Sequence, residues 1–245
     1  FSKYLLKDVT TALGKSLLNC KLEESINWAV ELLISGYSDK FWDKILSIGI
    51  KNVNINNPNI GIFLYSKYSK YIKLIEKTDL LSLRNNQVFR NMIAEICFII
   101  CNSLKTKNLA FTKIKENDFN LNFLESKISA NNPNIVTDKL KYGDPPETKL
   151  VLNEFNYCLV NKNYELCVYW LSWIFEWEKK NTKKDKMYIC GLREINNVDK
   201  KYHNDLVWLV WEIILSEGIK IENDFLNLNI QSLYKLYKFD FKPSK

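Results

Sequence analysis

Apolar residues recur along most of this chain at intervals of three and four, the spacing of an amphipathic α-helix. The clearest stretch is 22–35, where Leu22, Ile26 and Leu33 share one face and Gly36 follows as a stop signal. The same spacing predicts a helix beginning at Ser38 and others at 2–13, 57–77, 86–104, 145–159, 164–178, 205–217 and 224–237. A short strand is an alternative at 109–112, but no stretch combines strict alternation with hairpin turns. The predicted fold is all-α, a two-lobed bundle of about eight to ten helices joined by a proline-containing linker.

Three of the five prolines lie in residues 129–146, together with Gly143 and many polar side chains. A run of this length without secondary structure is unusual inside one compact domain. We therefore predict that residues 129–146 are a linker or a functional loop. On this interpretation a basic N-terminal helical lobe spans 1–128, and a tryptophan-rich C-terminal helical lobe spans 147–245.

The tryptophans are concentrated in two of the predicted helices. One carries Trp170, Trp173 and Trp177 on one side, and the next carries Trp208 and Trp211, which makes five of the seven tryptophans. A helix that is apolar over so much of its circumference must be buried against other helices or against a partner. We predict that the two helices pack on each other and that Trp173, Trp177 and Trp211 form a partner-binding edge.

The formal net charge is +7, and most of it belongs to the N-terminal half. Residues 1–130 contain 18 Lys and Arg against 12 Asp and Glu, whereas residues 131–245 contain 17 against 16. In residues 65–73 tyrosines and lysines follow each other around a predicted helix, a combination that can bind phosphates and stack bases. The alternative is that the tyrosines pack inward and the lysines are solvated. The candidate nucleic-acid-binding residues are Lys67, Lys70, Lys73, Lys105, Lys107 and Lys113.

The sequence offers little material for a catalytic or metal site. His203 is the single histidine, so a pair of histidine ligands and a His-Glu-x-x-His motif are excluded. Gly14-Lys15-Ser16 resembles the end of a phosphate-binding loop, but the glycine required five residues before Gly14 is Val9, and the triplet follows a helix. We predict no catalytic residue, no metal and no cofactor.

Catalysis by carboxylates is a more remote alternative. Glu154 lies among the apolar residues of one predicted helix and Glu176 among the tryptophans of another, and burial can raise the pKa of such carboxyl groups. The favoured interpretation is that these acids pair with Arg193 or with the lysines near Lys179. An enzyme acting through Glu154, Glu176 or Arg193 would need a pocket in which they meet.

The six cysteines contain no Cys-x-x-Cys pair, and four of them lie inside apolar helical patterns: Cys97, Cys101, Cys158 and Cys167. This distribution favours reduced thiols in a reducing compartment over disulfides. No apolar run is long enough to cross a bilayer, so we expect no membrane span.

Short motifs spread over most of the chain carry a family resemblance: Trp28-Ala29, Glu31-Leu32, Ser35-Gly36, Trp42, Asn57-Pro58, Gly143-Asp144-Pro145, Asn153-Glu154-Phe155, Tyr169-Trp170, Trp173, Arg193, Asp205-Leu206, Trp208 and Trp211. In this combination the chain resembles an uncharacterised protein of mimivirus-like giant viruses, large DNA viruses of eukaryotes. No activity comes with that resemblance. Residues 24–59 are also similar to the helical collar of clamp-loader proteins, which implies at most a helical packing or oligomerisation role because the ATPase motifs are absent.

The resemblance and the lack of a catalytic constellation together predict a non-enzymatic viral protein that works through contacts with other viral proteins. A virion structural protein, a minor capsid protein or an assembly component fits this description. We expect it in the virion or in the viral factory of the host cytoplasm, and homo-oligomerisation is left open. The alternative is a DNA replication or packaging accessory protein that binds nucleic acid through its basic N-terminal half.

Overall fold

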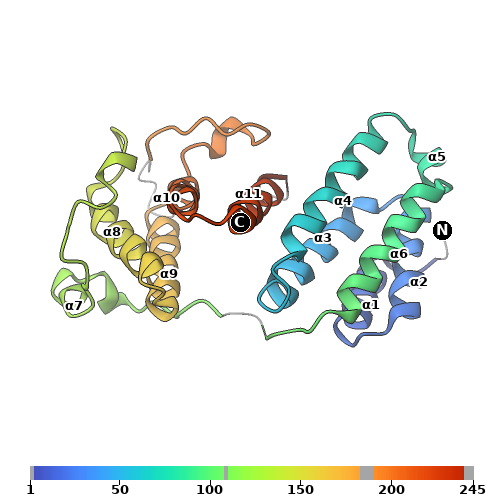
Figure 1. Ribbon diagram of the computed structural model, residues 1–245, viewed down its shortest axis with the longest axis horizontal. Coiled ribbons are helices and arrows are strands. Elements are labelled where there is room, and N and C mark those ends of the chain that lie inside the picture. The colour runs from blue at the N-terminus through green and yellow to red at the C-terminus, as the bar shows by residue number, and fades with distance from the viewer. Residues whose placement is uncertain (1–2, 108–109, 183–189, 240–245) are drawn as a thin grey trace. The chain divides into compact units, whose positions relative to one another are not determined.

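The computed structural model is all-α, as the apolar spacing predicted (Figure 1). The structure describes residues 3–107, 110–182 and 190–239. These residues contain 11 α-helices and no strand, and 69% of them are helical. Residues 110–112 are not a strand, and Leu109 lies outside the described residues. Two helices were not foreseen, α5 (Leu80–Arg84) and α7 (Leu121–Glu125), because five residues are too few to show an apolar period.

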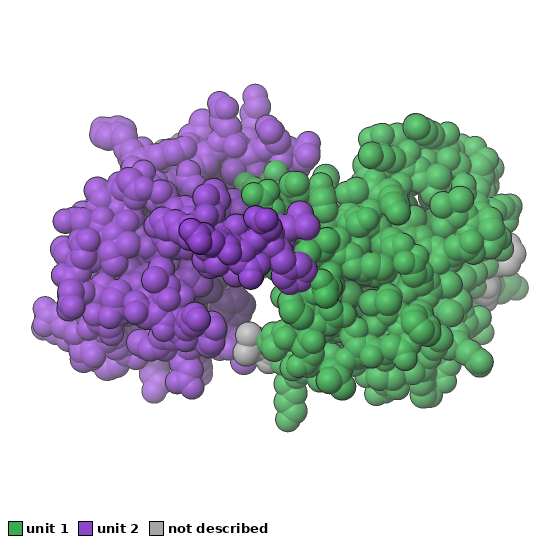
Figure 2. Space-filling view, viewed as in Figure 1, with its two compact units in different colours: residues 1–109, 231–240 green, residues 110–230, 241–245 purple. Residues whose placement is uncertain are grey.

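The contacts divide the chain into two compact units (Figure 2). Unit 1 comprises residues 1–109 and 231–240, and unit 2 comprises 110–230 and 241–245. Besides α5, unit 1 contains α1 (Leu6–Leu18), α2 (Leu22–Ile34), α3 (Ser38–Ile48), α4 (Ile60–Ile75) and α6 (Gln87–Asn102). Besides α7, unit 2 contains α8 (Pro146–Val160), α9 (Tyr164–Thr182) and α10 (Leu206–Lys220). The last helix, α11 (Asp224–Phe239), has its first part in unit 2 and its second part in unit 1.

The core of unit 1 forms where the apolar faces of α1, α2, α3, α4 and α6 meet. α1 packs on α2 and α3, and α2 packs on α6. Leu13, Leu32, Phe89 and Ile96 are fully buried in this core, and Leu236 of α11 joins them. Each buried side chain of this size stabilises a fold by about 1.5–3 kcal/mol.

Two glycines are required by the backbone of unit 1. Gly36 follows α2 with φ +83°, in the left-handed region that glycine tolerates best, which is the stop signal read from the sequence. Gly49 opens a π-helical turn, Gly49–Val53, that continues α3. A Cβ at Gly49 would lie 2.5 Å from Cδ1 of Leu64, so any larger residue there would have to displace this buried side chain.

The core of unit 2 contains the tryptophans that the sequence singled out. α8 packs on α9, and α10 packs on both. Trp170 and Trp173 of α9 and Trp208 of α10 are each exposed by 3% or less. The predicted pairing of the two tryptophan helices is therefore present, with α8 as a third member.

Residues 129–146, which the sequence predicted to be a linker or a functional loop, lie within unit 2. The chain changes from one unit to the other after Leu109 and again inside α11. Two buried polar residues of α8 hold this segment. The Glu154 carboxylate accepts hydrogen bonds from the backbone N–H groups of Ser129 (2.8 Å) and Ala130 (3.2 Å). The Asn153 amide oxygen accepts one from the N–H of Ile135 at 2.8 Å. Sequence composition marked the segment as irregular but could not show these anchors.

Candidate functional site

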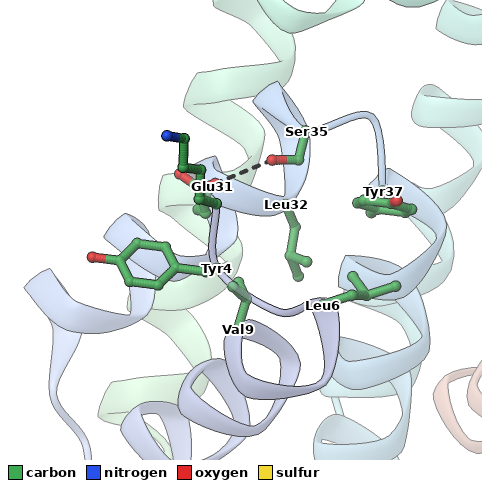
Figure 3. A pocket seen from close by; sticks show the side chains of 8 residues that line it. Tyr4, Leu6, Val9, Glu31, Leu32, Ser35 and Tyr37 are labelled. Carbon is green, nitrogen blue, oxygen red and sulfur yellow. Dashed lines mark hydrogen bonds between the residues drawn. The ribbon is translucent and has the colours of Figure 1, made fainter. Parts of the chain in front are cut away.

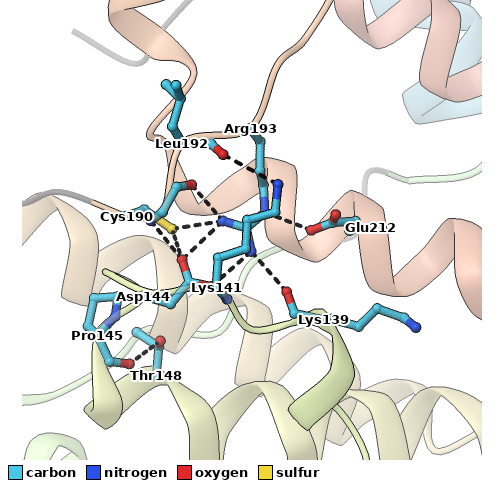
Figure 4. Close-up of polar contacts among 10 residues, drawn as sticks. Lys139, Lys141, Asp144, Pro145, Thr148, Cys190, Leu192, Arg193 and Glu212 are labelled. Atoms are coloured by element: carbon cyan, nitrogen blue, oxygen red, sulfur yellow. Dashed lines mark hydrogen bonds and ion pairs between the residues drawn. The ribbon is translucent and has the colours of Figure 1, made fainter.

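The most polar buried cluster in unit 2 is centred on Arg193 (Figure 4). Its guanidinium group lies between two carboxylates, with Nη2 2.9 Å from Oδ2 of Asp144 and Nε 2.7 Å from Oε2 of Glu212. Nη1 also donates to the carbonyl oxygen of Gly191 at 2.8 Å. The Asp144 side chain in turn accepts from the Cys190 thiol at 2.8 Å. Arg193 therefore ties the end of the 129–146 segment to the chain around Cys190 and to α10.

The electrostatics of this cluster are those of a structural ion pair. Burial alone would raise the pKa of the Asp144 carboxyl, but hydrogen bonds from Arg193, from Cys190 and from the N–H of Lys141 lower it to about 2. Asp144 is thus ionised at neutral pH and fully paired. Cys190 is completely buried, so its thiol has no exposed surface on which a reagent could act.

The three residues considered for catalysis are not brought together at one pocket. Glu154 caps the backbone at 129–130 instead of pairing with Arg193, which corrects the expected partner. Glu176 is exposed and pairs with Lys179 at 3.2 Å, as the favoured interpretation predicted. Among the described residues, no three or more His, Cys, Asp and Glu side chains lie together in a group that could hold a metal.

Two of the six candidate lysines are committed to contacts within unit 1. Lys67 of α4 pairs with Glu95 of α6 at 2.5 Å, and its side chain is 14% exposed. Lys105 donates to three backbone carbonyls at the end of α6, those of Ile100, Cys101 and Ser103, at 2.7–3.1 Å. A cation at the C-terminal end of a helix offsets the partial negative charge there. The Lys67 and Lys105 side chains therefore make contacts that stabilise unit 1.

The other four candidate lysines are exposed. Lys70, Lys73 and Lys107 lie in unit 1, and Lys113 lies in unit 2. None of the four has an ion pair with a carboxylate of the described residues. Their role in nucleic-acid binding stays a prediction.

The predicted partner-binding tryptophans differ in burial. Trp173 is a core residue, 3% exposed, and its indole N–H donates to the carbonyl oxygen of Asp118 at 2.8 Å. Trp177 stacks on Trp173 with ring centres 6.3 Å apart and is half-buried, as is Trp211. The structure thus leaves only the edges of Trp177 and Trp211 for a partner, and that role stays a prediction.

Two carboxyl groups near the start of α10 have raised pKa values, whereas the sequence had singled out Glu154 and Glu176 for such a shift. Glu178 of α9 accepts a hydrogen bond from the N–H of Leu206, the first residue of α10, at 2.8 Å. Burial raises the pKa of Glu178 to about 7, with a further contribution from the charge of Asp205. Burial also raises the pKa of Asp205 to about 6. Both groups lie in unit 2 and away from any described pocket.

Unit 1 contains a pocket of about 160 Å³ between the start of α1 and the end of α2 (Figure 3). Its lining residues are Lys3, Tyr4, Leu6, Val9, Glu31, Leu32, Ser35 and Tyr37. Val9 and Leu32 are buried, whereas Tyr4 is 61% and Tyr37 is 43% exposed. Figure 3 shows the two tyrosines on opposite sides with Leu32 between them. We call this feature the Tyr4–Tyr37 pocket.

Polar side chains also line this pocket, namely Lys3, Glu31 and Ser35. The Ser35 hydroxyl donates to the Glu31 carboxylate at 3.1 Å (Figure 3). Next to the pocket, Leu5 is 71% exposed, and the Tyr4 ring meets Trp28 edge-on at 5.6 Å. The arrangement is an apolar floor of Leu6, Val9 and Leu32 under a rim that combines two tyrosines with Lys3, Glu31 and Ser35. No sequence motif signalled it, because its residues come from three separate helix ends.

Comparisons with protein-family models, with curated proteins and with solved structures found no match to this chain. In the described part of the chain, no helix combines the length and the apolar character that crossing a membrane requires.

Proposed function

We propose that this protein acts through protein–protein contacts and that the Tyr4–Tyr37 pocket is one of its contact sites. The observation that carries the proposal is the exposed aromatic rim over a buried apolar floor. Tyr4, Leu5 and Tyr37 all leave large apolar surfaces in water beside the pocket. Exposed apolar surface of this kind marks interaction sites more often than it marks ordinary protein surface.

The dimensions of the pocket suit a single anchoring side chain from a partner. Its volume of about 160 Å³ is close to the roughly 150 Å³ of a cavity that holds one benzene molecule. A side chain of that size gains about 1.5–3 kcal/mol when it leaves water. A few anchors that fill well-packed, desolvated pockets supply most of the binding energy of protein interfaces.

A photo-crosslinking amino acid placed at Tyr37 tests the proposal in the cells that make the protein. We expect a covalent adduct with a second polypeptide at Tyr37. The matched control is Tyr142 in unit 2, which is fully exposed and lines no described pocket. Equal adducts at both positions, or none at either, would contradict a specific contact at this pocket.

The more specific version of the proposal is a virion structural, minor capsid or assembly protein. It is supported by the sequence resemblance to a protein of giant viruses and by nothing in the geometry. Quantitative mass spectrometry of purified, salt-washed particles tests it. A fixed copy number per particle is expected, and absence from the particles would rule this version out.

A second candidate function is nucleic-acid binding by unit 1. Unit 1 has 17 Lys and Arg against 10 Asp and Glu in its sequence, whereas unit 2 has 18 of each, so the net charge of +7 belongs entirely to unit 1. Phosphate contacts make binding strongly dependent on salt. The full-length protein should bind DNA at low ionic strength and lose affinity as salt is added, and absence of binding at low salt would refute this function.

A further inference from the structure

Two helical segments of unit 1 carry lysines and no acidic residue. Residues 60–75, which form α4, contain Lys67, Lys70 and Lys73 and no Asp or Glu. In α11 the only acidic residue is Asp224, at its start, and the part that belongs to unit 1 contains Lys235 and Lys238 within the helix. The lysines of these two helical segments therefore have no carboxylate on the same segments that could offset their mutual repulsion.

The two segments pack against each other within unit 1. The Tyr68 ring of α4 meets the Phe239 ring of α11 with centroids 5.3 Å apart. The ammonium group of Lys235 lies over the Tyr65 ring of α4, 5.1 Å from its centroid. Leu236 is buried in the unit 1 core between these contacts along the helix. Residues 170 and 171 positions apart in the sequence, Tyr65 with Lys235 and Tyr68 with Phe239, thus form one surface.

Lysines of both segments reach the surface of unit 1, exposed on α4 and half-buried on α11. On α4, Leu64 and Tyr71 point into the core, and helix geometry places Lys70 and Lys73 on the opposite side, where both are exposed. Lys235 and Lys238 are one turn apart on α11. None of the four has an ion pair with a carboxylate in the described parts of the chain. We call these four residues the α4–α11 lysine surface.

The rings of the three α4 tyrosines, Tyr65, Tyr68 and Tyr71, already pack against other side chains. Tyr71 is 7% exposed and stacks on Phe89, with ring centroids 5.1 Å apart. Tyr68 packs against Trp42 as well as Phe239, and Lys235 covers the Tyr65 ring. Single-stranded nucleic acids are held largely by bases that stack on free aromatic faces. The α4 part of the surface therefore presents charge while its three tyrosine rings are already in contact with other residues.

We propose that the α4–α11 lysine surface binds the phosphate backbone of double-stranded nucleic acid, without reading its sequence. A duplex has the highest density of phosphate charge and needs no stacking of bases on protein. This inference rests on the second candidate function and names the site and the ligand. It also adds Lys235 and Lys238, which sequence reasoning omitted because α11 lies in the C-terminal half of the chain.

The test is a salt titration of binding to a 20-base-pair DNA duplex by the full-length protein and two double variants. Lys70→Gln with Lys73→Gln removes the α4 lysines, and Lys235→Gln with Lys238→Gln removes the α11 lysines. Each phosphate contact contributes about −0.9 to the slope of log K against log salt. Each double variant should therefore make the slope shallower by about 1.8.

The matched control is the pair Lys162→Gln and Lys200→Gln, which removes the same charge from two exposed positions of unit 2. The control should keep the wild-type slope. If the wild type binds but the α11 variant keeps its slope, the site is wrong while nucleic-acid binding stands. If the wild type does not bind, the second candidate function fails as well.

Two further binding measurements distinguish duplex DNA from single-stranded DNA and from anionic lipid as the ligand of this surface. A 20-nucleotide single strand should bind more weakly than the duplex at every salt concentration. Tighter binding to the single strand would overturn the argument from the covered rings. Binding to vesicles with 30% anionic lipid that exceeds binding to duplex DNA, and that depends on the same four lysines, would overturn the choice of ligand.

Discussion

Replacement of Glu178 by Gln should stabilise unit 2 at alkaline pH. Glu178 accepts the N–H of Leu206 at 2.8 Å, and the amide oxygen of Gln can accept the same hydrogen bond. The substitution therefore removes the charge and keeps the contact. In the wild type, burial and the nearby Asp205 disfavour the ionised carboxylate, which raises its pKa to about 7.

The size of the expected stabilisation follows from the difference between the pKa of Glu178 in the folded chain and its pKa in the unfolded chain. The pKa is about 7 in the folded protein and 4.5 ordinarily, and one pKa unit corresponds to about 1.4 kcal/mol. Because the folded state holds the proton more tightly, the stability that Glu178 contributes is complete below pH 4.5 and is lost as the pH rises through 7. The loss is up to about 3 kcal/mol.

Urea unfolding at pH 5 and pH 8, followed by tryptophan fluorescence, measures this effect. Five of the seven tryptophans lie in unit 2, so the signal reports mainly on that unit. At pH 8 the Glu178→Gln variant should unfold at a urea concentration higher than the wild type by about 1–1.5 M, for a slope near 2 kcal/mol per M. At pH 5 the difference between the two midpoints should shrink to about 0.4 M.

Glu176→Gln is the matched control, since Glu176 is two residues away on the same helix and exposed. It should leave the pH dependence unchanged. A Glu178→Gln variant that is less stable than the wild type at pH 8, or that shows the wild-type pH dependence, would refute the assignment of a buried, destabilising carboxylate.

Two further substitutions test the buried contacts. Arg193→Met should destabilise unit 2 by about 3–5 kcal/mol, because it leaves the buried Asp144 without its partner, and urea unfolding measures the loss. The wild type should also lose stability as the pH falls from about 4 towards 2, where Asp144 gains a proton. Lys105→Met should speed hydrogen exchange at the end of α6 and cost about 1–2 kcal/mol, whereas Lys107→Met, which changes an exposed lysine, should have no effect.

Much of the fold could be predicted because helix signals are local. Gly36 adopts the positive φ that ends α2, and the tryptophan pattern identified the α9–α10 pair. The predicted first and last residues of the helices were less accurate. The helix predicted at 2–13 runs from Leu6 to Leu18, so Gly14-Lys15-Ser16 lie inside it. The apolar spacing continues from Leu13 to Leu17, both fully buried, so Gly14 does not end the helix.

The site residues were harder to predict because their properties are created by contacts distant in sequence. Glu154 was expected to pair with a cation, but a loop 24–25 residues earlier supplies two N–H groups to it. Tyr68 and Tyr71 were candidates for base stacking, yet their faces are covered by Trp42 and Phe89. Periodicity shows that a helix has two faces, and it does not show which neighbours cover them.

The central claim, a protein contact at the Tyr4–Tyr37 pocket, is tested most directly by the size of the assembly in which the protein is isolated from the cells that make it. Size-exclusion chromatography with quantitative mass spectrometry should compare the wild type with Tyr37→Lys, which removes the aromatic ring from the rim and adds a charge there, and with Tyr142→Lys as the control. The account predicts an assembly well above the 28.9 kDa of one chain for the wild type and the control, and its loss in Tyr37→Lys. Elution of all three at the mass of one chain, or of all three in the same assembly, would contradict it.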